Sequence, residues 1–517
     1  MHRSPSRSWI LPVVLAAVLA GPAAGRAQDL ASFEARTTVH VLPNGWTFII
    51  SERPGAPVFS FATQADVGAA QDPKGQTGIA HMFEHMAFKG TPVIGTTDYE
   101  RERPALDALE QAYQAWQAAR DTPGTAQEEL DRLWKKFEEA QAHAQQFVRP
   151  NELDEIVTRA GGVGLNAGTS SDATTYYYSL PANKFELFAY LESERFWRPV
   201  LREFYKERDV VIEERRMRTE SQPTGRLFER FVAAAFVAHS YRNPPVGHRS
   251  DLERLTMTDA QAFFERYYGP SNLVTAIVGG IKAKEIIPII DKYFGRIPAR
   301  PKPQPLRTHE PPQIAETVVT LRDPAQPFYL EGYHKPAATH PDEPAYDALA
   351  DVLTRGRTSR LYRLLVRDKK LAVAVQGGSG LPGVKYPNLF VLLAVPARGI
   401  SNDAVRDAMR PELERLKTEP VTDEELQRFK TRAKADLIRS LNSNAGLASQ
   451  LAAYHVLFGD WRELFRYVDR MEAVTKADIM RVAKSLFTEA NRTVGRIETS
   501  SAPEEKEKTP AATEEKK

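Results

Sequence analysis

Two distant segments of the sequence follow the same pattern. Residues 255–272 begin a predicted helix with Leu-Thr-Met-Thr-Asp and end at Asn272, just before a predicted strand. Residues 474–491 begin with Val-Thr-Lys-Ala-Asp, end at Asn491 before a strand, and align with the first segment without a gap. In both, a threonine followed three residues later by an aspartate is close to a capping box, which starts helices. The repeat predicts an ancient duplication, with two α+β domains of similar plan.

The length of the chain supports this division. A chain of 517 residues is too long for one hydrophobic core, and 42% hydrophobic and 26% charged residues are typical of a globular protein. The Pro-rich segment 298–312 predicts a stiff interdomain linker. We therefore expect a first domain over residues 28–297 and a second over residues 313–498. The tail at residues 499–517 is rich in Ser, Pro, Ala, Lys and Glu and is expected to be disordered.

The N-terminus has the features of a secretory signal. Two arginines precede an apolar stretch over residues 10–19, and small residues lead up to Ala27. We predict a signal peptide over residues 1–27 rather than a membrane anchor, because the apolar stretch is too short to span a bilayer. The chain has no cysteine, which excludes a disulfide framework and a lipoprotein cysteine. We expect the protein in the periplasm or extracellular space, with no stable membrane span after signal cleavage.

The segment Ala-His-Met-Phe-Glu-His-Met, residues 80–86, is the candidate for chemistry. On a helix, His81 and His85 lie on the same face, so both imidazoles can reach one metal ion. Neutral imidazoles suit zinc, and Glu84 can take a proton from a zinc-bound water. This is the inverted HxxEH form of the zinc-protease motif. The alternative of two ordinary histidines is disfavoured, because the chain has only 11 histidines and these two flank a glutamate.

Three further patterns bear on the site. Residues 101–150 predict an inserted helical hairpin, and residues 161–181 predict strand. A predicted helix over residues 207–217 places Glu207 and Glu214 two turns apart, hence on one face. Such a charged face is usually solvated, but the predicted zinc helix still lacks an acidic third ligand. In the second domain the helix in the corresponding place, near residues 346–353, has no histidine, so we expect one active site per chain.

With these motifs described, the chain resembles the pitrilysin-type (M16) zinc peptidases, most closely their mitochondrial-processing-peptidase-like branch. The motifs that carry the resemblance are the active-site signature at residues 78–91, the second metal segment at 207–214, the edge strand at 166–181 and the end of the first domain at 239–278. The resemblance extends over roughly residues 38–498. It implies an α+β fold with two homologous α/β-sandwich domains, the duplicated LuxS/M16-like metalloenzyme type. The helical hairpin is inserted in the first domain.

The resemblance also implies roles for the motif residues. His81, His85 and Glu214 would bind one zinc ion per chain, Glu84 would be the general base, and the Glu207 carboxylate would support the site from outside the ligands. The gap between His85 and Glu214 is longer than is usual in the family, and the inserted hairpin accounts for the difference. In addition, the neighbouring residue Glu213 remains an alternative ligand, although its side chain should point about 100° away around the helix.

Substrate binding is implied at two places. Asn166 and Ala167 would pair with the main chain of a peptide by strand addition. Many active members also hold substrate with an Arg and a Tyr seven residues apart in the second domain. The matching positions here are Val366 and Val373, with Arg367 as a near neighbour. We therefore predict a dimer in which this chain bears the zinc and a homologous subunit supplies the Arg/Tyr pair.

The predicted function is a zinc-dependent endopeptidase acting on peptides or unfolded polypeptide segments. A non-catalytic scaffold of the same fold is the main alternative, and the intact His81, Glu84, His85 and Glu214 argue against it. A metal-binding or peptide-binding module without turnover is the third interpretation. A net charge of +2 gives no basic footprint for nucleic acid. The secretory signal favours peptide degradation or maturation over presequence processing.

Overall fold

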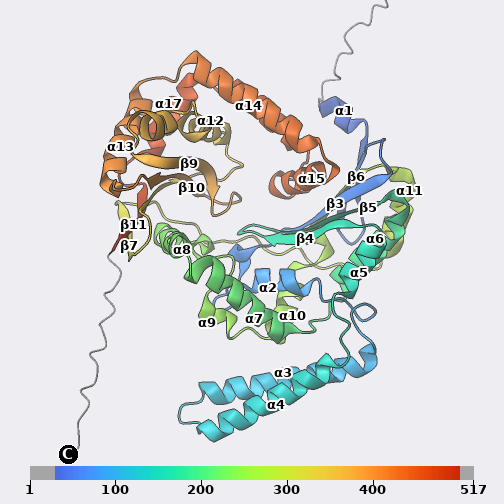
Figure 1. Cartoon of the computed structure of the whole chain (residues 1–517). Helices are drawn as coiled ribbons and strands as arrows, with labels where there is room; N and C mark the ends of the chain where they lie inside the picture. The colour runs from blue at the N-terminus through green and yellow to red at the C-terminus, as the bar shows by residue number, and fades with distance from the viewer. Residues whose placement is uncertain (1–29, 501–517) are drawn as a thin grey trace, which may run out of the picture.

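The computed structural model describes residues 30–500 and contains two β-sheets (Figure 1). The predicted signal peptide and most of the predicted disordered tail lie outside the described residues. The first sheet consists of β1 (Thr37–Val41), β2 (Thr47–Glu52), β3 (Val58–Ala65), β4 (Val163–Thr169), β5 (Thr174–Pro181) and β6 (Leu273–Gly279). The second consists of β7 (Thr317–Asp323), β8 (Phe328–Lys335), β9 (Ala372–Leu381), β10 (Asn388–Pro396) and β11 (Arg492–Thr499).

Helices cover both sheets. Those of the first half are α1 (Leu30–Glu34), α2 (Ile79–Met86), α3 (Tyr99–Asp121), α4 (Gln127–Gln145), α5 (Glu152–Arg159), α6 (Phe185–Trp197), α7 (Phe204–Arg215), α8 (Pro223–Ala235), α9 (Arg249–Leu252), α10 (Met257–Tyr267) and α11 (Ala283–Phe294). Those of the second half are α12 (Glu343–Thr354), α13 (Asn402–Thr418), α14 (Asp423–Leu441), α15 (Asn444–Phe458), α16 (Glu463–Ala473) and α17 (Lys476–Leu486). Among the residues that the structure describes, no helix is both long and apolar enough to cross a membrane.

The two sheets share one connectivity. The first has the order β1-β2-β6-β3-β5-β4 and the second the order β7-β11-β8-β10-β9. In each, one pair of neighbouring strands is parallel, β2 with β6 and β7 with β11, and the strands that follow in the sheet order pair antiparallel. In chain order, β2 to β6 therefore correspond one to one with β7 to β11, and β1 is an addition to the first sheet. This repeat confirms the predicted α+β fold with two homologous domains.

The repeated sequence pattern has the same structural role in both halves. The predicted threonine and aspartate form a complete capping box at the start of α10 and at the start of α17. At the other end, Asn272 Nδ2 donates to the Tyr267 carbonyl at 2.9 Å, and Asn491 Nδ2 donates to the Leu486 carbonyl at 3.0 Å. The asparagine thus connects the end of each helix to the strand that follows it.

Two segments differ from the sequence prediction in detail. Residues 161–181, predicted as strand, form the hairpin of β4 and β5, because the Ser170 hydroxyl oxygen accepts the backbone N–H groups of Asp172 and Ala173 and makes a turn. The helix predicted over residues 207–217 begins earlier, as α7, and continues into a π-helical turn over Arg216–Glu220. The predicted hairpin at residues 101–150 is present as α3 and α4, which lie on the side of α7 away from the second sheet (Figure 1).

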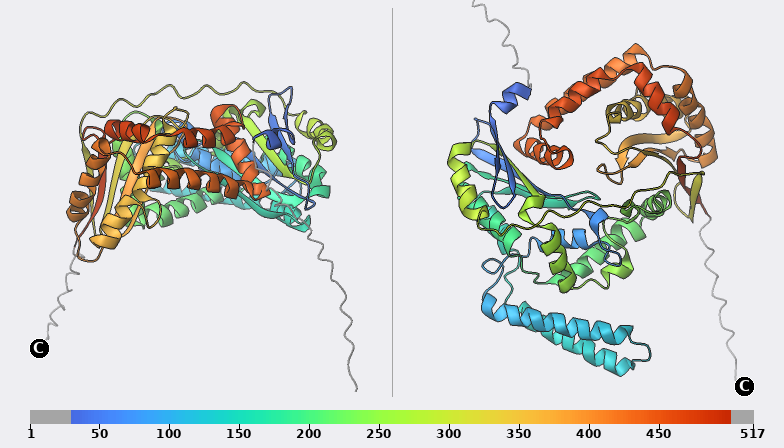
Figure 2. Two further views of the ribbon diagram at one scale, coloured as in Figure 1. Left: turned by 90° about the horizontal axis from the view of Figure 1, so that it is seen from above. Right: turned by 180° about the vertical axis from the view of Figure 1, so that it is seen from behind.

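The Pro-rich segment is extended and is held to the body by hydrogen bonds. Residues 295–316 contain no helix or strand, and the segment crosses from the first half to the second (Figure 2). The Glu310 carboxylate accepts the backbone N–H groups of Val237, Ala238 and His239 at 2.7–3.0 Å. This contact ties the segment to the chain just after α8.

Each half places one helix on the sheet of the other half. Helix α15 of the second half packs on β3 and β6, and α8 of the first half packs on β7 and β11. Phe231 of α8 lies over Gly332 and Gly495, where an added Cβ would come within 2.6 and 3.0 Å of its ring. The two faces of the first sheet consequently belong to different halves. Phe48 packs on Phe294 of α11 with ring centroids 4.9 Å apart, and the neighbouring Ile49 faces the cluster formed with α15.

Replacing Leu451 of α15 by alanine should destabilise the whole protein. Leu451 is fully buried among residues of both halves, so its loss leaves a cavity that costs about 2–5 kcal/mol. Calorimetry should show a lower melting temperature for the complete chain. The matched control is Ile438→Ala on α14, because Ile438 is 50% exposed and should be nearly neutral. Equal effects of the two substitutions would contradict the assigned packing of α15.

Candidate metal centre

Helix α2 is held at its start by buried polar contacts. The Asp72 carboxylate accepts the N–H of Gly78 at 2.7 Å and that of Ala80 at 3.1 Å. Gly78 has φ of 90°, and a Cβ at this position would lie 2.7 Å from the carbonyl oxygen of Val246. Four residues of the helix, Ile79, Met82, Phe83 and Met86, are fully buried. The opposite face of α2, which carries the two histidines and Glu84, is thereby fixed toward α7 and β4.

Three of the predicted ligands converge. His81 Nε2 lies 3.8 Å and His85 Nε2 lies 3.7 Å from the same oxygen, Oε2 of Glu214 on α7. The potential ligand atoms of the three residues all lie within 4.8 Å of one another, and no other such group of at least three occurs in residues 30–500. Burial, and then the nearby charges of His85 and Arg218, lower the pKa of His81 to about 4. His81 is therefore neutral near pH 7, as a metal ligand must be.

The alternative ligand Glu213 does not reach the site. Its side chain is about half exposed and forms two hydrogen bonds with the guanidinium of Arg216, at 2.5 and 2.7 Å. This follows from the rotation of about 100° per residue around a helix, which turns Glu213 to solvent when Glu214 faces α2.

Glu207 contacts His85 on the side of the ring that faces away from Glu214. Its Oε2 lies 3.3 Å from His85 Nδ1, and its Oε1 accepts a hydrogen bond from Lys89 Nζ at 2.5 Å. Burial acts to raise the pKa of Glu207, but the hydrogen bonds from His85 and Lys89 outweigh it and lower the pKa to about 2. The resulting carboxylate favours the tautomer in which His85 donates its Nδ1 proton, which leaves the Nε2 lone pair free on the side of Glu214.

Glu84 lies on the same helix and is held by β4. The Thr169 hydroxyl donates to Glu84 Oε2 at 2.6 Å. Burial raises the pKa of Glu84, and the Thr169 hydrogen bond only partly opposes this shift. A carboxylate with a raised pKa is a better proton acceptor at neutral pH than an exposed glutamate.

The predicted substrate residues lie on the free edge of the first sheet. Asn166 and Ala167 belong to β4, which pairs with β5 on one side only. The Asn166 side-chain oxygen accepts the N–H of Ala167 at 2.9 Å, and Asn166 is exposed. In the second half, Val366 is partly buried in the turn over residues 362–368, and Val373 is 59% exposed on β9. The nearby Arg367 pairs with its neighbour Asp368.

Four residues in or next to the site were missed by the sequence reasoning. The hydroxyl of Thr169 donates to Glu84, and Arg218 pairs with Glu214. Lys89, which lies beside Glu207, pairs with Glu203. Two of these had a signal, because Lys89 follows His85 by four residues and Glu203 precedes Glu207 by four. Thr169 had no such signal, since it joins the site only through the β4–β5 hairpin.

The donor set fits zinc. Two neutral imidazoles and one carboxylate are the ligands of many catalytic zinc sites, which leave a fourth position for water. Both imidazoles direct Nε2 toward the same carboxylate oxygen at distances too long for hydrogen bonds, so the three groups surround a common point without satisfying one another.

Replacing Glu207 by glutamine should weaken zinc binding about 10- to 100-fold, because glutamine keeps the shape but removes the charge that orients His85. Titration against a chelating indicator measures this change. Glu203→Gln is the matched control, since Glu203 contacts Lys89 at 3.3 Å but does not contact His85. If the control lowered affinity as much as Glu207→Gln, the effect would come from Lys89 rather than from the histidine contact.

Two protein families match parts of this chain. The family described as "Insulinase (Peptidase family M16)" matches residues 47–115, and the one described as "Peptidase M16 inactive domain" matches residues 254–433. A relative named "Zinc protease PqqE" from Helicobacter pylori is 28% identical over 83% of this chain and 84% of its own length. The beta subunit of mitochondrial-processing peptidase from Saccharomyces cerevisiae is 23% identical over 86% of this chain and 87% of that subunit.

Solved structures share the fold. The crystal structure of a protease from Helicobacter pylori has a TM-score of 0.75 and 27% identity, and it covers 89% of this chain and 99% of that one. The first half of the periplasmic protease PqqL from Escherichia coli has a TM-score of 0.64 at 18% identity. The match covers 89% of this chain and 92% of that chain. The second similarity concerns the fold alone.

Proposed function

This chain belongs to the M16 family of peptidases, and from that membership we propose that it is a zinc-dependent endopeptidase acting on peptides or unfolded segments. The observation that carries the proposal is the convergence of His81, His85 and Glu214, with Glu84 beside them on α2. Relatives named zinc proteases support the metal, of which we propose one ion per chain.

The proposed mechanism assigns each side chain a separate task. Zinc, when bound, would lower the pKa of a water molecule and polarise the scissile carbonyl. His81, His85 and Glu214 would hold the ion, with the orientation of His85 set by Glu207. Glu84 would accept the proton of the attacking water and pass it to the leaving amine. The Thr169 hydroxyl would keep the Glu84 carboxylate in place during both transfers.

We further propose that peptides bind along β4. Within residues 30–500 its outer edge has no partner strand, and Asn166 and Ala167 lie on it next to Thr169, which reaches the site. An extended peptide added to this edge by main-chain hydrogen bonds would therefore pass Glu84. A periplasmic location fits the signal expected in residues 1–27 and the periplasmic protease among the similar folds.

Hydrolysis of a mixed quenched-peptide library by the purified chain tests the function. A chelator should abolish hydrolysis, and added zinc should restore it. A non-catalytic scaffold, the alternative that the "inactive domain" description of residues 254–433 keeps open, would bind zinc or peptide without any turnover. Bound zinc with no hydrolysis under any pairing with related subunits would overturn the proposal.

A partner subunit is the second part of the proposal. The positions of the family's Arg/Tyr pair hold Val366 and Val373, and the relatives include a peptidase subunit from mitochondria. The double substitution Val366→Arg with Val373→Tyr should raise hydrolysis by the chain alone about tenfold or more, because it supplies the missing substrate contacts. Comparison of kcat/KM with and without a homologous partner measures this. Full activity of the unmodified chain alone would contradict the partner hypothesis.

A further inference from the structure

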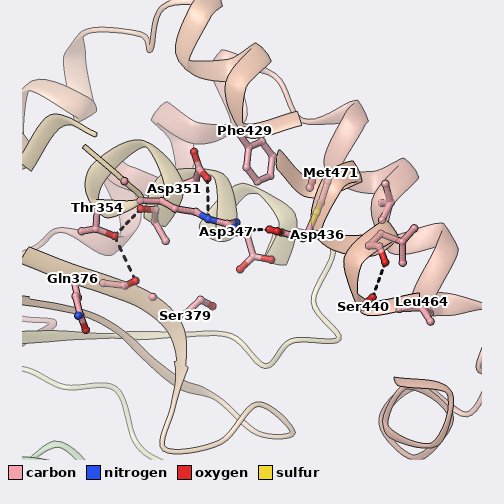
Figure 3. Close-up of a pocket in the computed structure, with 18 of the residues that line it drawn as sticks. Asp347, Asp351, Thr354, Gln376, Ser379, Phe429, Asp436, Ser440, Leu464 and Met471 are labelled. Carbon is pink, nitrogen blue, oxygen red and sulfur yellow. Dashed lines mark hydrogen bonds and ion pairs between the residues drawn. The ribbon is translucent and has the colours of Figure 1, made fainter. Parts of the chain in front are cut away.

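A cavity of about 710 Å³ lies in the second half among α12, α14 and β9 (Figure 3). The helices and the strand around it correspond to those around the metal centre. Helix α2 packs against α7, α10 and β4, and α12 packs against the corresponding elements α14, α17 and β9. The cavity therefore occupies the place in the second half that the metal centre occupies in the first.

Acidic side chains line this cavity. Asp347 and Asp351 lie four residues apart on α12, as the two histidines do on α2, and Asp436 comes from α14. Two of the three are neutralised by arginines. Arg355 pairs with Asp436 and lies 3.8 Å from Asp351 Oδ2, and Arg432 donates to Asp351 Oδ1 at 3.0 Å. Guanidinium groups thus occupy the space between carboxylates where the first half has its candidate metal site.

Asp347 lacks such a counter-charge. Its Oδ2 accepts a hydrogen bond from the Tyr467 hydroxyl, and no ion pair to it exists within residues 30–500. Burial, and then the charge of Glu343, raise the pKa of Asp347 to about 7. Beside it, Asp351 is only 5% exposed, and its Oδ2 accepts no hydrogen bond. Acceptors kept from water without full pairing cost free energy, which a cation entering the cavity would offset.

The remaining wall combines apolar and polar side chains. Its apolar part includes Ala350, Phe429, Ala433, Leu464, Val468 and Met471. These side chains suit the methylene stem of a long basic side chain, whose charged end can then reach a carboxylate of the same cavity. A small hydrated metal ion would leave this apolar surface uncovered.

We propose that this cavity binds a cationic group carried by a peptide, with Asp347 as its counter-charge. A lysine or arginine side chain and a free amino terminus share this chemistry. The inference rests on the proposed function, because a peptidase meets peptides as ligands. It adds to that function a preference for basic peptides that is set away from the metal centre.

The test measures binding rather than hydrolysis. The full-length Glu84→Gln protein with zinc is titrated, by fluorescence anisotropy, with labelled peptides blocked at both ends that carry one lysine at successive positions. Norleucine replaces lysine in matched peptides, and a third set has norleucine and a free amino terminus. At least one lysine peptide should bind about tenfold tighter than its norleucine match, and Asp347→Asn should remove the difference. If the norleucine peptides with a free amino terminus bind more tightly than the blocked norleucine peptides, the amino terminus is the ligand.

Two further variants make the result specific. Asp407→Asn removes a carboxylate that is 66% exposed elsewhere in the second half, and it should leave the preference unchanged. Met471→Lys brings a tethered cation into the same cavity and should abolish the preference even if Asp347→Asn fails to fold. Equal binding of all three peptide sets, or a preference that survives Asp347→Asn, overturns the inference. This test measures binding, whereas the proposed function is tested by hydrolysis. A chain that hydrolyses no peptide would therefore contradict the proposed function and leave the outcome of the binding test independent.

Discussion

Hydrolysis by the Glu84→Gln variant should fall about 10²- to 10⁴-fold, the range that a general base contributes. Glutamine has nearly the shape of glutamate, and its side-chain oxygen can still accept the Thr169 hydroxyl, which donates to Glu84 at 2.6 Å. What it cannot do is accept a proton from water. Zinc content should stay the same as in the unmodified protein, because Glu84 is not among the converging ligands. Kinetics with a quenched peptide and metal analysis of the same sample measure both quantities.

The control for this substitution lies nearby. Glu213→Gln also removes one negative charge, but from a side chain that is half exposed and paired with Arg216, so hydrolysis should be unchanged. If Glu84→Gln kept most of the activity, the base would have to be sought elsewhere, and the proposed mechanism would be wrong.

Removal of the third predicted zinc ligand, Glu214, should lower hydrolysis by a comparably large factor, because it weakens zinc binding. In Glu214→Ala, the two histidines lose the oxygen that lies 3.8 and 3.7 Å from their Nε2 atoms. Zinc affinity should fall by more than the roughly 100-fold that loss of an outer partner costs, and hydrolysis should fall with it. Zinc per chain after dialysis, measured by atomic emission, should drop well below that of the unmodified protein.

Glu213→Ala is the matched comparison, because it truncates the adjacent residue of the same helix. It should retain zinc, since its carboxylate faces Arg216 and solvent. If Glu213→Ala lost zinc and Glu214→Ala retained it, Glu213 would be the ligand and Glu214 the residue that faces solvent. Such a result would require α7 to turn by about 100° relative to α2.

Local patterns in the sequence predicted the parts of the structure that depend on neighbouring residues. The helix with His81 and His85, the capping boxes of α10 and α17, and the hairpin of α3 and α4 all arise from spacings within a few turns. Periodicity alone did not identify Glu214 as a ligand, because the contact joins residues far apart in the chain. The resemblance to a family supplied that assignment, and in the structure Glu214 lies beside His81 and His85.

Other features depend on tertiary packing and left no local signal. Thr169 reaches Glu84 only because β4 folds back on β5 through the turn at Ser170. The placement of α15 on the first sheet could not be read from its sequence, since its apolar residues suit any sheet. The same holds for the arginines that neutralise Asp351, which come from α14 and from the residue after α12.

The exchange of α8 and α15 between the halves has a consequence for how far the halves can move relative to one another. The two halves cannot open like a clamshell about the extended segment, because opening would pull α15 off β3 and β6 and expose fully buried residues such as Leu451 to water. Burial of apolar surface makes that separation costly, at roughly 25 cal/mol for each Å² exposed. The two halves should then keep one relative position for as long as the chain is folded.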